Sequence, residues 1–123
     1  MRTENVVYFS AEEEEFANLL VGIGLRRNIA KVLVFLAKHP EATSRAVERG
    51  AAMRQPEVSL IMRALIGHGW ITSRETRFEN RGRPVYVYGL AKPITEIMDF
   101  IEMEKVRETA EQLAMIRQLR SFA

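Results

Sequence analysis

The sequence contains no cysteine, and this absence removes several classes of site. Without thiols the chain forms no disulfide, no thiolate zinc site and no cysteine nucleophile, and it fits an intracellular protein. Only two histidines are present, His39 and His68. Each falls at the end of an expected helix, where an imidazole more often caps the helix than performs catalysis.

Long hydrophobic runs are also missing. No apolar stretch reaches the roughly 18 residues of a membrane-spanning helix, and Met1 to Ser10 lacks a charged-then-apolar signal pattern, so we expect a cytoplasmic protein with no membrane partner. The sequence has no glycine-rich phosphate loop, its serines lie in no nucleophile motif, and its carboxylates lie on helix faces. We therefore expect no enzyme activity, no cofactor and no metal.

What is present indicates one small folded domain with an uneven charge. The chain has 123 residues, of which 47% are hydrophobic and 28% charged, as in soluble globular domains. Its net charge is only +2, but residues 1–20 carry −4, residues 21–92 carry +8 and residues 93–123 carry −2. A polyanion would therefore meet the middle of the chain.

The first half of the sequence predicts helices. Ser10 followed by Glu13 has the order of a capping box, so a helix begins there and continues to Gly22. A core helix is expected from Arg26 to Lys38, where apolar residues recur at helical spacing and His39-Pro40 ends the pattern.

Two further helices form a helix-turn-helix pattern. Thr43 caps a short helix over 44–49, which Gly50 closes, and a tight turn follows. Pro56 suits the first turn of the next helix, which ends near His68-Gly69. The side chains expected to point inward from this second helix are Val58, Ile61, Met62 and Leu65.

The second half predicts a hairpin and a long helix. Residues 70–78 and 85–88 are strand-like, and the polar segment 79–84 between them resembles a wing. A final helix over 94–121 carries an apolar stripe, weakened at Glu102, Glu104 and Lys105, that requires a partner helix. We expect a mainly α fold with a small β-hairpin (α+β), a winged helix-turn-helix: an N-terminal helical extension (1–24), a DNA-binding domain (25–91) and a C-terminal dimerisation helix (92–123).

Five segments stand out in this order of elements: Thr43-Ser44-Arg45-Ala46-Val47, Val58-Ser59 through Leu65, Gly69-Trp70-Ile71, Gly82-Arg83-Pro84 and Tyr88-Gly89-Leu90. With the order of the elements, they resemble the winged-helix transcriptional regulators of prokaryotes, particularly archaeal proteins near the ArsR, MarR and TrmB-like groups. The resemblance implies that the second helix of the motif enters the major groove, while the hairpin tip touches flanking backbone or the minor groove. The sequence departs from the family pattern at Arg54, where a small hydroxyl residue is usual, and at Leu60, where a polar residue is common.

Inward packing of one face leaves a set of candidate DNA-binding residues outside. On the recognition helix these are Gln55, Glu57, Ser59, Leu60 and Arg63, joined by Arg54 and Arg45. The tip Arg81-Gly82-Arg83-Pro84 is suited to a narrow A·T minor groove. The structural alternative is that Glu57 favours the helix start and that Arg63 and the tip are solvated charges. For Trp70, Tyr86 and Tyr88, core packing is favoured over base stacking.

These patterns predict a transcriptional regulator that binds double-stranded DNA as a homodimer. Two alternatives stay open: a protein-interaction winged-helix module of the transcription machinery, and a chromosomal protein that coats DNA with low specificity. No residue pattern names an operator sequence or a small-molecule effector.

Overall fold

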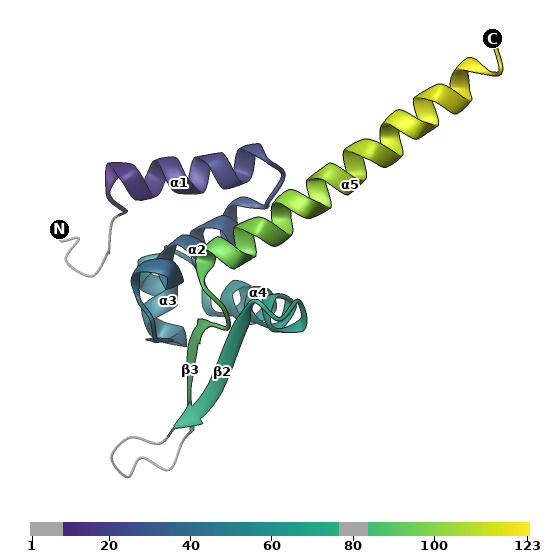
Figure 1. Ribbon diagram of the computed structural model, residues 1–123. Helices are drawn as coiled ribbons and strands as arrows, with labels where there is room; N and C mark the ends of the chain where they lie inside the picture. Colours follow the sequence, from purple (N-terminus) through teal and green to yellow (C-terminus); the bar gives the residue numbers. More distant parts are fainter. Residues whose placement is uncertain (1–8, 77–83) are drawn as a thin grey trace. The chain divides into compact units, whose positions relative to one another are not determined.

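The computed structural model describes residues 9–76 and 84–123, which form two compact units, residues 1–92 and residues 93–123 (Figure 1). The first unit holds four helices and three strands in its described part, and the second holds one helix. In chain order the elements are α1 (Ala11–Gly22), α2 (Arg27–Lys38), β1 (Ala42–Thr43), α3 (Ser44–Gly50), α4 (Gln55–Gly67), β2 (Ile71–Thr76), β3 (Val85–Leu90) and α5 (Ile94–Arg120). This is the winged helix-turn-helix fold that the sequence predicts.

Helix α1 begins where the capping box predicts. The Ser10 hydroxyl accepts a hydrogen bond from the Glu13 backbone N–H at 3.1 Å, and a Glu13 carboxylate oxygen accepts one from the Ser10 N–H at 2.8 Å. These bonds satisfy two amides that would otherwise lack a partner at the helix start. One face of α1 then packs on α2 through Ala17 and Leu20.

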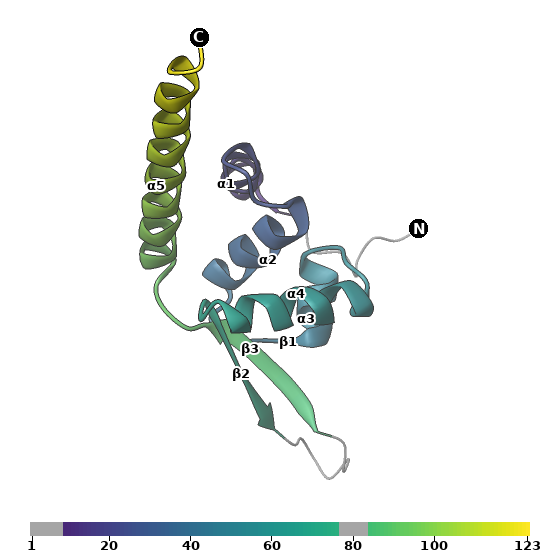
Figure 2. The ribbon, with the colours of Figure 1, turned by 90° about the vertical axis from the view of Figure 1, so that its right-hand side faces the viewer.

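Helix α2 lies at the centre of the first unit. Five consecutive residues, Val32 to Leu36, are buried, so the helix is covered on several sides at once. On one side Ala30 and Val34 join Ala17 and Leu20 of α1 in a single apolar cluster. Helix α3 and strand β3 cover other parts of α2. Figures 1 and 2 show α2 between α1 and the helix-turn-helix pair α3–α4.

The turn between α3 and α4 differs from the sequence expectation. Gly50 was expected to close the helix, but it is the last residue of α3 and lies against Phe35, where an added Cβ would come within 2.0 Å of a ring carbon. The residue in the left-handed region is instead Ala52, with φ of 55°. Gly50 is therefore required by its close packing against Phe35, and the left-handed backbone conformation of the turn is adopted by Ala52.

The sheet is small and antiparallel, with strand order β1-β3-β2. Strands β2 and β3 form the predicted hairpin, in which Ile71 pairs with Leu90 and Thr76 with Val85. Strand β1 is too short to be seen in the sequence pattern, and it pairs Ala42 with Tyr88. Figure 2 shows the hairpin extending away from the helices of the first unit.

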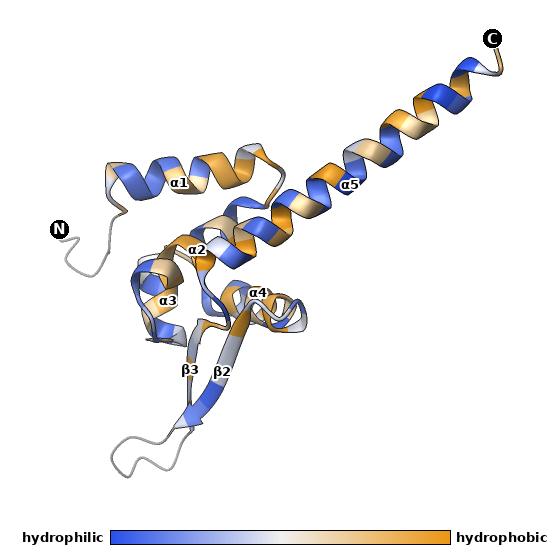
Figure 3. Cartoon of the chain, viewed as in Figure 1, coloured by the Kyte–Doolittle hydropathy of each residue, from blue (hydrophilic) through white to orange (hydrophobic). Residues whose placement is uncertain are grey.

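The second unit consists mainly of α5, whose 27 residues extend about 40 Å at 1.5 Å per residue. Apolar and hydrophilic residues alternate along its length (Figure 3). On the polar side, Arg107 pairs with both Glu104 and Glu111, and Lys105 pairs with Glu108. Within the described residues, no helix combines the length and apolar character needed to cross a membrane.

Replacing Gly50 by alanine tests the contact between α3 and α2. The new methyl group would displace the buried Phe35 ring, so we expect Gly50→Ala to lower the free energy of unfolding by about 1–3 kcal/mol. Gly67→Ala is the matched control, because a Cβ there meets no atom within 4 Å. The control should instead gain about 0.5–1 kcal/mol from helix propensity. Urea denaturation of both variants measures the difference, and equal effects would contradict the packing role of Gly50.

Replacing Ala52 by glycine tests the strain in the turn. The left-handed backbone conformation has a higher conformational free energy for alanine than for glycine. Ala52→Gly should therefore raise the free energy of unfolding by about 0.5–1 kcal/mol. The same substitution at Ala64, exposed within α4, should lower it by about 1 kcal/mol. Thermal denaturation compares the two, and destabilisation by both would show that Ala52 is not strained.

Candidate nucleic-acid interface

Helix α4 is anchored on one side and leaves the opposite side free. Val58, Met62 and Leu65 are buried at the spacing of one helical face. At 100° per residue, Leu60 and Arg63 lie on the opposite face, and both are exposed. Leu60 keeps 65% of its surface open. These two residues form the outward crest of α4.

One flank of α4 borders a groove of about 720 Å³ toward the hairpin, lined by polar and apolar side chains. The groove brings together residues from α3, α4 and β3 that are far apart in the sequence. Its lining consists of Thr43, Ser44, Arg45, Glu48, Gln55, Ser59, Pro84, Val85, Tyr86 and Tyr88. Three candidate residues from the sequence, Arg45, Gln55 and Ser59, therefore share one surface, which we call the hairpin groove.

The hairpin groove contains both hydrogen-bond donors and hydrogen-bond acceptors. Gln55 donates from Nε2 to the Ser59 hydroxyl at 3.5 Å, a long bond that a ligand could replace. Burial, and then the neighbouring Tyr86, raise the pKa of the Tyr88 phenol, so its hydroxyl stays protonated near neutral pH and can donate. Ser44 donates to a Glu48 carboxylate oxygen at 3.4 Å.

The other flank of α4 faces the start of α2 across a second groove of about 370 Å³. Glu57, Leu60, Ile61 and Ala64 line it from α4. A Glu57 carboxylate oxygen accepts a hydrogen bond from the Arg54 backbone N–H at 3.1 Å. Glu57 thus helps to start the helix, which favours the structural alternative for this candidate.

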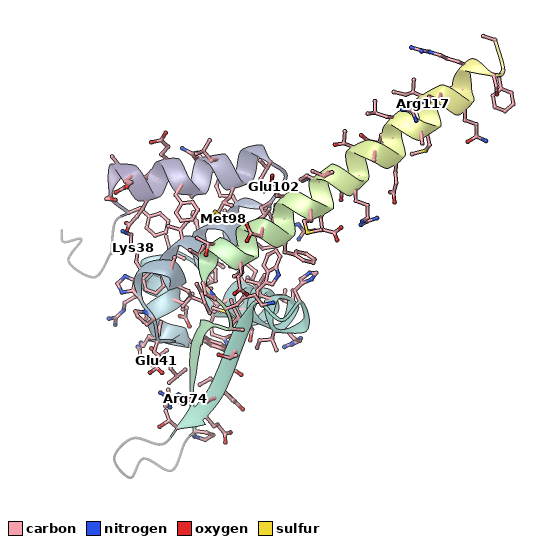
Figure 4. All side chains as sticks on the ribbon, viewed as in Figure 1. Lys38, Glu41, Arg74, Met98, Glu102 and Arg117 are labelled. Atoms are coloured by element: carbon pink, nitrogen blue, oxygen red, sulfur yellow. The ribbon has the colours of Figure 1, made fainter. Side chains whose placement is uncertain are left out.

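The arginines of this region differ in whether they form ion pairs. Arg74 of β2 is held by Glu41 at 2.8 Å (Figure 4), which neutralises it. Arg45, Arg54 and Arg63 are exposed and form no ion pair within residues 9–76 and 84–123. These three guanidinium groups are available to an anion.

The wing-tip candidates Arg81, Gly82 and Arg83 lie outside the described residues. The residue after them, Pro84, is exposed and lines the hairpin groove. The chain therefore leaves the tip segment at the same groove that holds Arg45 and Gln55.

Two side chains lie where the sequence interpretation did not put them. Ile61 was expected to be buried, but it is half-buried and lines the second groove, because it lies at the edge of the face that Val58, Met62 and Leu65 form. Tyr86 was expected to pack in the core, but 49% of its surface is exposed. Trp70 and Val87 are buried as core residues.

Strand alternation could have identified the tyrosine face. In Val85-Tyr86-Val87-Tyr88 successive side chains point to opposite faces of the sheet, and Val87 takes the inward one. Tyr86 and Tyr88 consequently share the face that borders the hairpin groove. Thr43 and Ser44 were also missed as groove residues, since nothing local marks them beyond the helix cap. The part of the chain that the structure describes holds no group of three or more possible metal ligands.

Comparisons with known proteins support the fold. No protein-family model and no curated protein matches the sequence. Among solved structures, TrmBL2, described as an archaeal chromatin protein with a novel mode of DNA binding, aligns with a TM-score of 0.65 at 16% identity over 89% of this chain. A possible transcriptional regulator from Methanosarcina mazei aligns with a TM-score of 0.61 at 15% identity over 90% of the chain. A MarR family transcription regulator aligns with a TM-score of 0.52 at 20% identity over 81% of the chain.

The lengths of these structures differ from that of the present chain. The chain spans 40% of TrmBL2 and 62% of the MarR family regulator, but 93% of the Methanosarcina protein. At these identities the alignments show a shared winged-helix fold.

The exposure of Tyr86 predicts that its removal costs little stability. We expect Tyr86→Ala to change the free energy of unfolding by less than about 1 kcal/mol, because its ring is half open to solvent. Trp70→Ala should cost about 3–5 kcal/mol, because that ring is buried. Urea denaturation distinguishes the two, and a loss at Tyr86 comparable to that at Trp70 would make Tyr86 a core residue.

Proposed function

We propose that this protein is a transcriptional regulator that binds double-stranded DNA, with α4 in the major groove and the hairpin tip on the flanking DNA. The observation that carries the proposal is the hairpin groove. There Arg45, Gln55 and Ser59 line a single surface that borders the exposed crest of α4. This surface belongs to the basic middle of the sequence, residues 21–92, whose net charge is +8.

The dimensions of α4 suit a major groove. A helix with its side chains is about 10–12 Å across, and the major groove of B-form DNA is about 12 Å wide. Because Val58, Met62 and Leu65 face the core, the crest of α4 and its flank toward the hairpin are left to approach base edges.

The exposed side chains divide into those that can contact base edges and those that can bind phosphates. Gln55 can form two hydrogen bonds with adenine, and Leu60 can contact a thymine methyl group. Arg63 can bind a guanine edge or a phosphate, and Arg45 and Arg54 can bind phosphates. Ser59 lies beside Gln55 and can donate to a base or orient that amide.

The hairpin tip extends the same surface. Arg81 and Arg83 flank Gly82, and guanidinium groups on a chain that approaches closely are suited to a narrow, electronegative minor groove. Pro84, the first described residue after them, lines the hairpin groove, which supports a continuous contact from α4 to the tip.

We further propose that the protein acts as a homodimer in the cytoplasm. Exposed apolar side chains on α1 and directly after it, such as Leu19 and Ile23, and on α5, such as Val106 and Leu113, require cover. A two-fold dimer would present two recognition helices to successive major grooves about 34 Å apart, and would favour an inverted-repeat operator. The names of the similar structures, a chromatin protein and transcription regulators, accord with a DNA-binding role.

The test begins with selection of bound duplexes from a random pool, followed by mobility-shift titration of variants on the selected sequence. Arg45→Ala should weaken binding to every duplex alike and reduce the slope of log K against log salt by about 0.9, the value for one lost phosphate contact. Gln55→Ala should weaken binding to the selected site about 5- to 150-fold, with little effect on random duplex. Arg81→Ala together with Arg83→Ala should weaken binding most on A·T-rich flanks.

Arg107→Ala is the charge-matched control, because this arginine lies on α5 and is already paired with Glu104 and Glu111. It should leave the salt slope unchanged. A ratio near one between selected and random duplex would favour the low-specificity chromosomal protein. No salt-sensitive binding to any duplex would favour the protein-interaction module and contradict the proposal.

A further inference from the structure

The exposed part of α5 carries an apolar centre on one face. Val106, Ala110 and Leu113 recur at spacings of four and three residues, which keeps them on one side of the helix. Val106 is 63% exposed and Leu113 is 50% exposed, and Ala110 between them is exposed as well. A short apolar seam of this kind pairs with another helix.

The same face continues into charges of opposite sign at its two ends. Before the apolar centre the pattern continues with Asp99 and Glu102, and after it with Arg117 and Arg120. From Asp99 to Arg120 the spacings are 3, 4, 4, 3, 4 and 3, and their average is the 3.5 residues of a coiled-coil seam. We call this face of α5, from Asp99 to Arg120, the α5 seam.

The ion pairs within α5 do not use the α5 seam. Arg107 with Glu104 and Glu111, and Lys105 with Glu108, lie around the other side of the helix at 100° per residue. The four charged residues of the seam are exposed and form no ion pair among residues 9–76 and 84–123. Their charges are therefore available to a partner.

These opposite charges cannot meet within one helix. Glu102 and Arg117 are 15 residues apart, which is about 22 Å along α5. Figure 4 shows them well separated along the helix. When two copies of the seam overlap along their full length, a second helix that runs in the opposite direction brings an arginine of the seam beside an acid of the seam.

We propose that α5 pairs antiparallel with α5 of a second copy of this chain, about a two-fold axis between Thr109 and Ala110. In that register Glu102 faces Arg117 of the other copy, and Asp99 faces Arg120. Val106 faces Leu113, and the small Ala110 at the centre lets the two helices approach closely. Each of the other six seam residues then faces its complement, and Ala110 lies next to the axis opposite Thr109 of the other copy.

A parallel pair uses the same seam and is disfavoured. It would set Glu102 against Glu102, and Arg117 against Arg117, in a geometry where like charges repel. Exposed ion pairs add little to the affinity between two helices. Their main effect here is to favour the antiparallel over the parallel direction of the two α5 helices. This inference specifies the geometry of the homodimer proposed above and rests on that dimer, but not on DNA binding.

Cysteine cross-linking in the full chain tests the direction, and the native sequence has no thiol to interfere. Val106→Cys and Leu113→Cys are made separately. In the antiparallel pair each variant alone stays uncross-linked, because two copies of position 106 are about 10 Å apart along the axis, beyond the reach of a disulfide. Mixing the two variants under oxidising conditions should give a covalent dimer. Gln118→Cys, on the other side of the helix, is the control and should form no cross-link with either variant.

Charge reversal measured by sedimentation equilibrium provides the second test. Glu102→Arg and Arg117→Glu should each weaken dimerisation roughly three- to tenfold at low salt, and the double variant should return to within about twofold of the wild type. Glu111→Arg, an equal change of charge away from the seam, should leave the dimer unchanged.

Self-cross-linking of each single cysteine variant would overturn the proposal in favour of a parallel pair. Absence of any cross-link, or a double charge variant weaker than both singles, would overturn it as well. A mobility shift on the selected duplex is run with the same samples. DNA binding without these cross-links would contradict the antiparallel pair and leave the proposed DNA-binding function standing. The expected cross-links without DNA binding would support the antiparallel pair and contradict the proposed function.

Discussion

Burial of α2 on several sides constrains the rest of the first unit. A helix turns about 100° per residue, so five consecutive buried side chains, Val32 to Leu36, point in all directions around its axis. Neighbours must therefore surround the helix. Helix α1 covers Val34, and α3 approaches so closely at Phe35 that only glycine fits at position 50. Because α3 is fixed against α2, the turn at Ala52 and the path into α4 are fixed as well.

The candidate interface depends on how little of α4 is needed for this packing. Three residues hold the helix, and the others are left on a crest and two flanks. One flank faces the hairpin, where the alternation of β3 presents Tyr86 and Tyr88 toward α4. The other flank is occupied in part by the bond from Arg54 to Glu57 that starts the helix. The residues able to recognise a ligand thus lie on the crest and on the hairpin side.

The second unit separates two uses of charge on one helix. Ion pairs around Arg107 support an exposed helix from within, as pairs three and four residues apart do. Glu104 and Glu111 accordingly raise the pKa of the Arg107 guanidinium. On the α5 seam, by contrast, acids and arginines stand at opposite ends and have no partner along the same helix. The first arrangement stabilises a single helix, and the second is the basis of the antiparallel pair that we propose.

Signals within a few residues of each other were sufficient for the elements of the fold. The caps at Ser10 and Thr43, and the inward stripe of Val58, Met62 and Leu65, followed from the sequence because each depends on contacts within one or two helical turns. The residues that face outward from α4 were also predictable, among them Leu60 and Arg63 on its crest. The role of Gly50, the strain at Ala52 and the exposure of Tyr86 were not predictable, since each depends on what lies opposite in space.

The sequence by itself determined where the helices begin and end, which face of each is apolar, and where positive charge collects. Tertiary structure alone decided that Arg45, Gln55 and Tyr86 line one groove, because they come from three elements separated by up to 41 positions in the chain. Local periodicity specifies the direction of a side chain relative to its own helix or strand. The packing of α3, α4 and β3 around α2 specifies which of those directions converge.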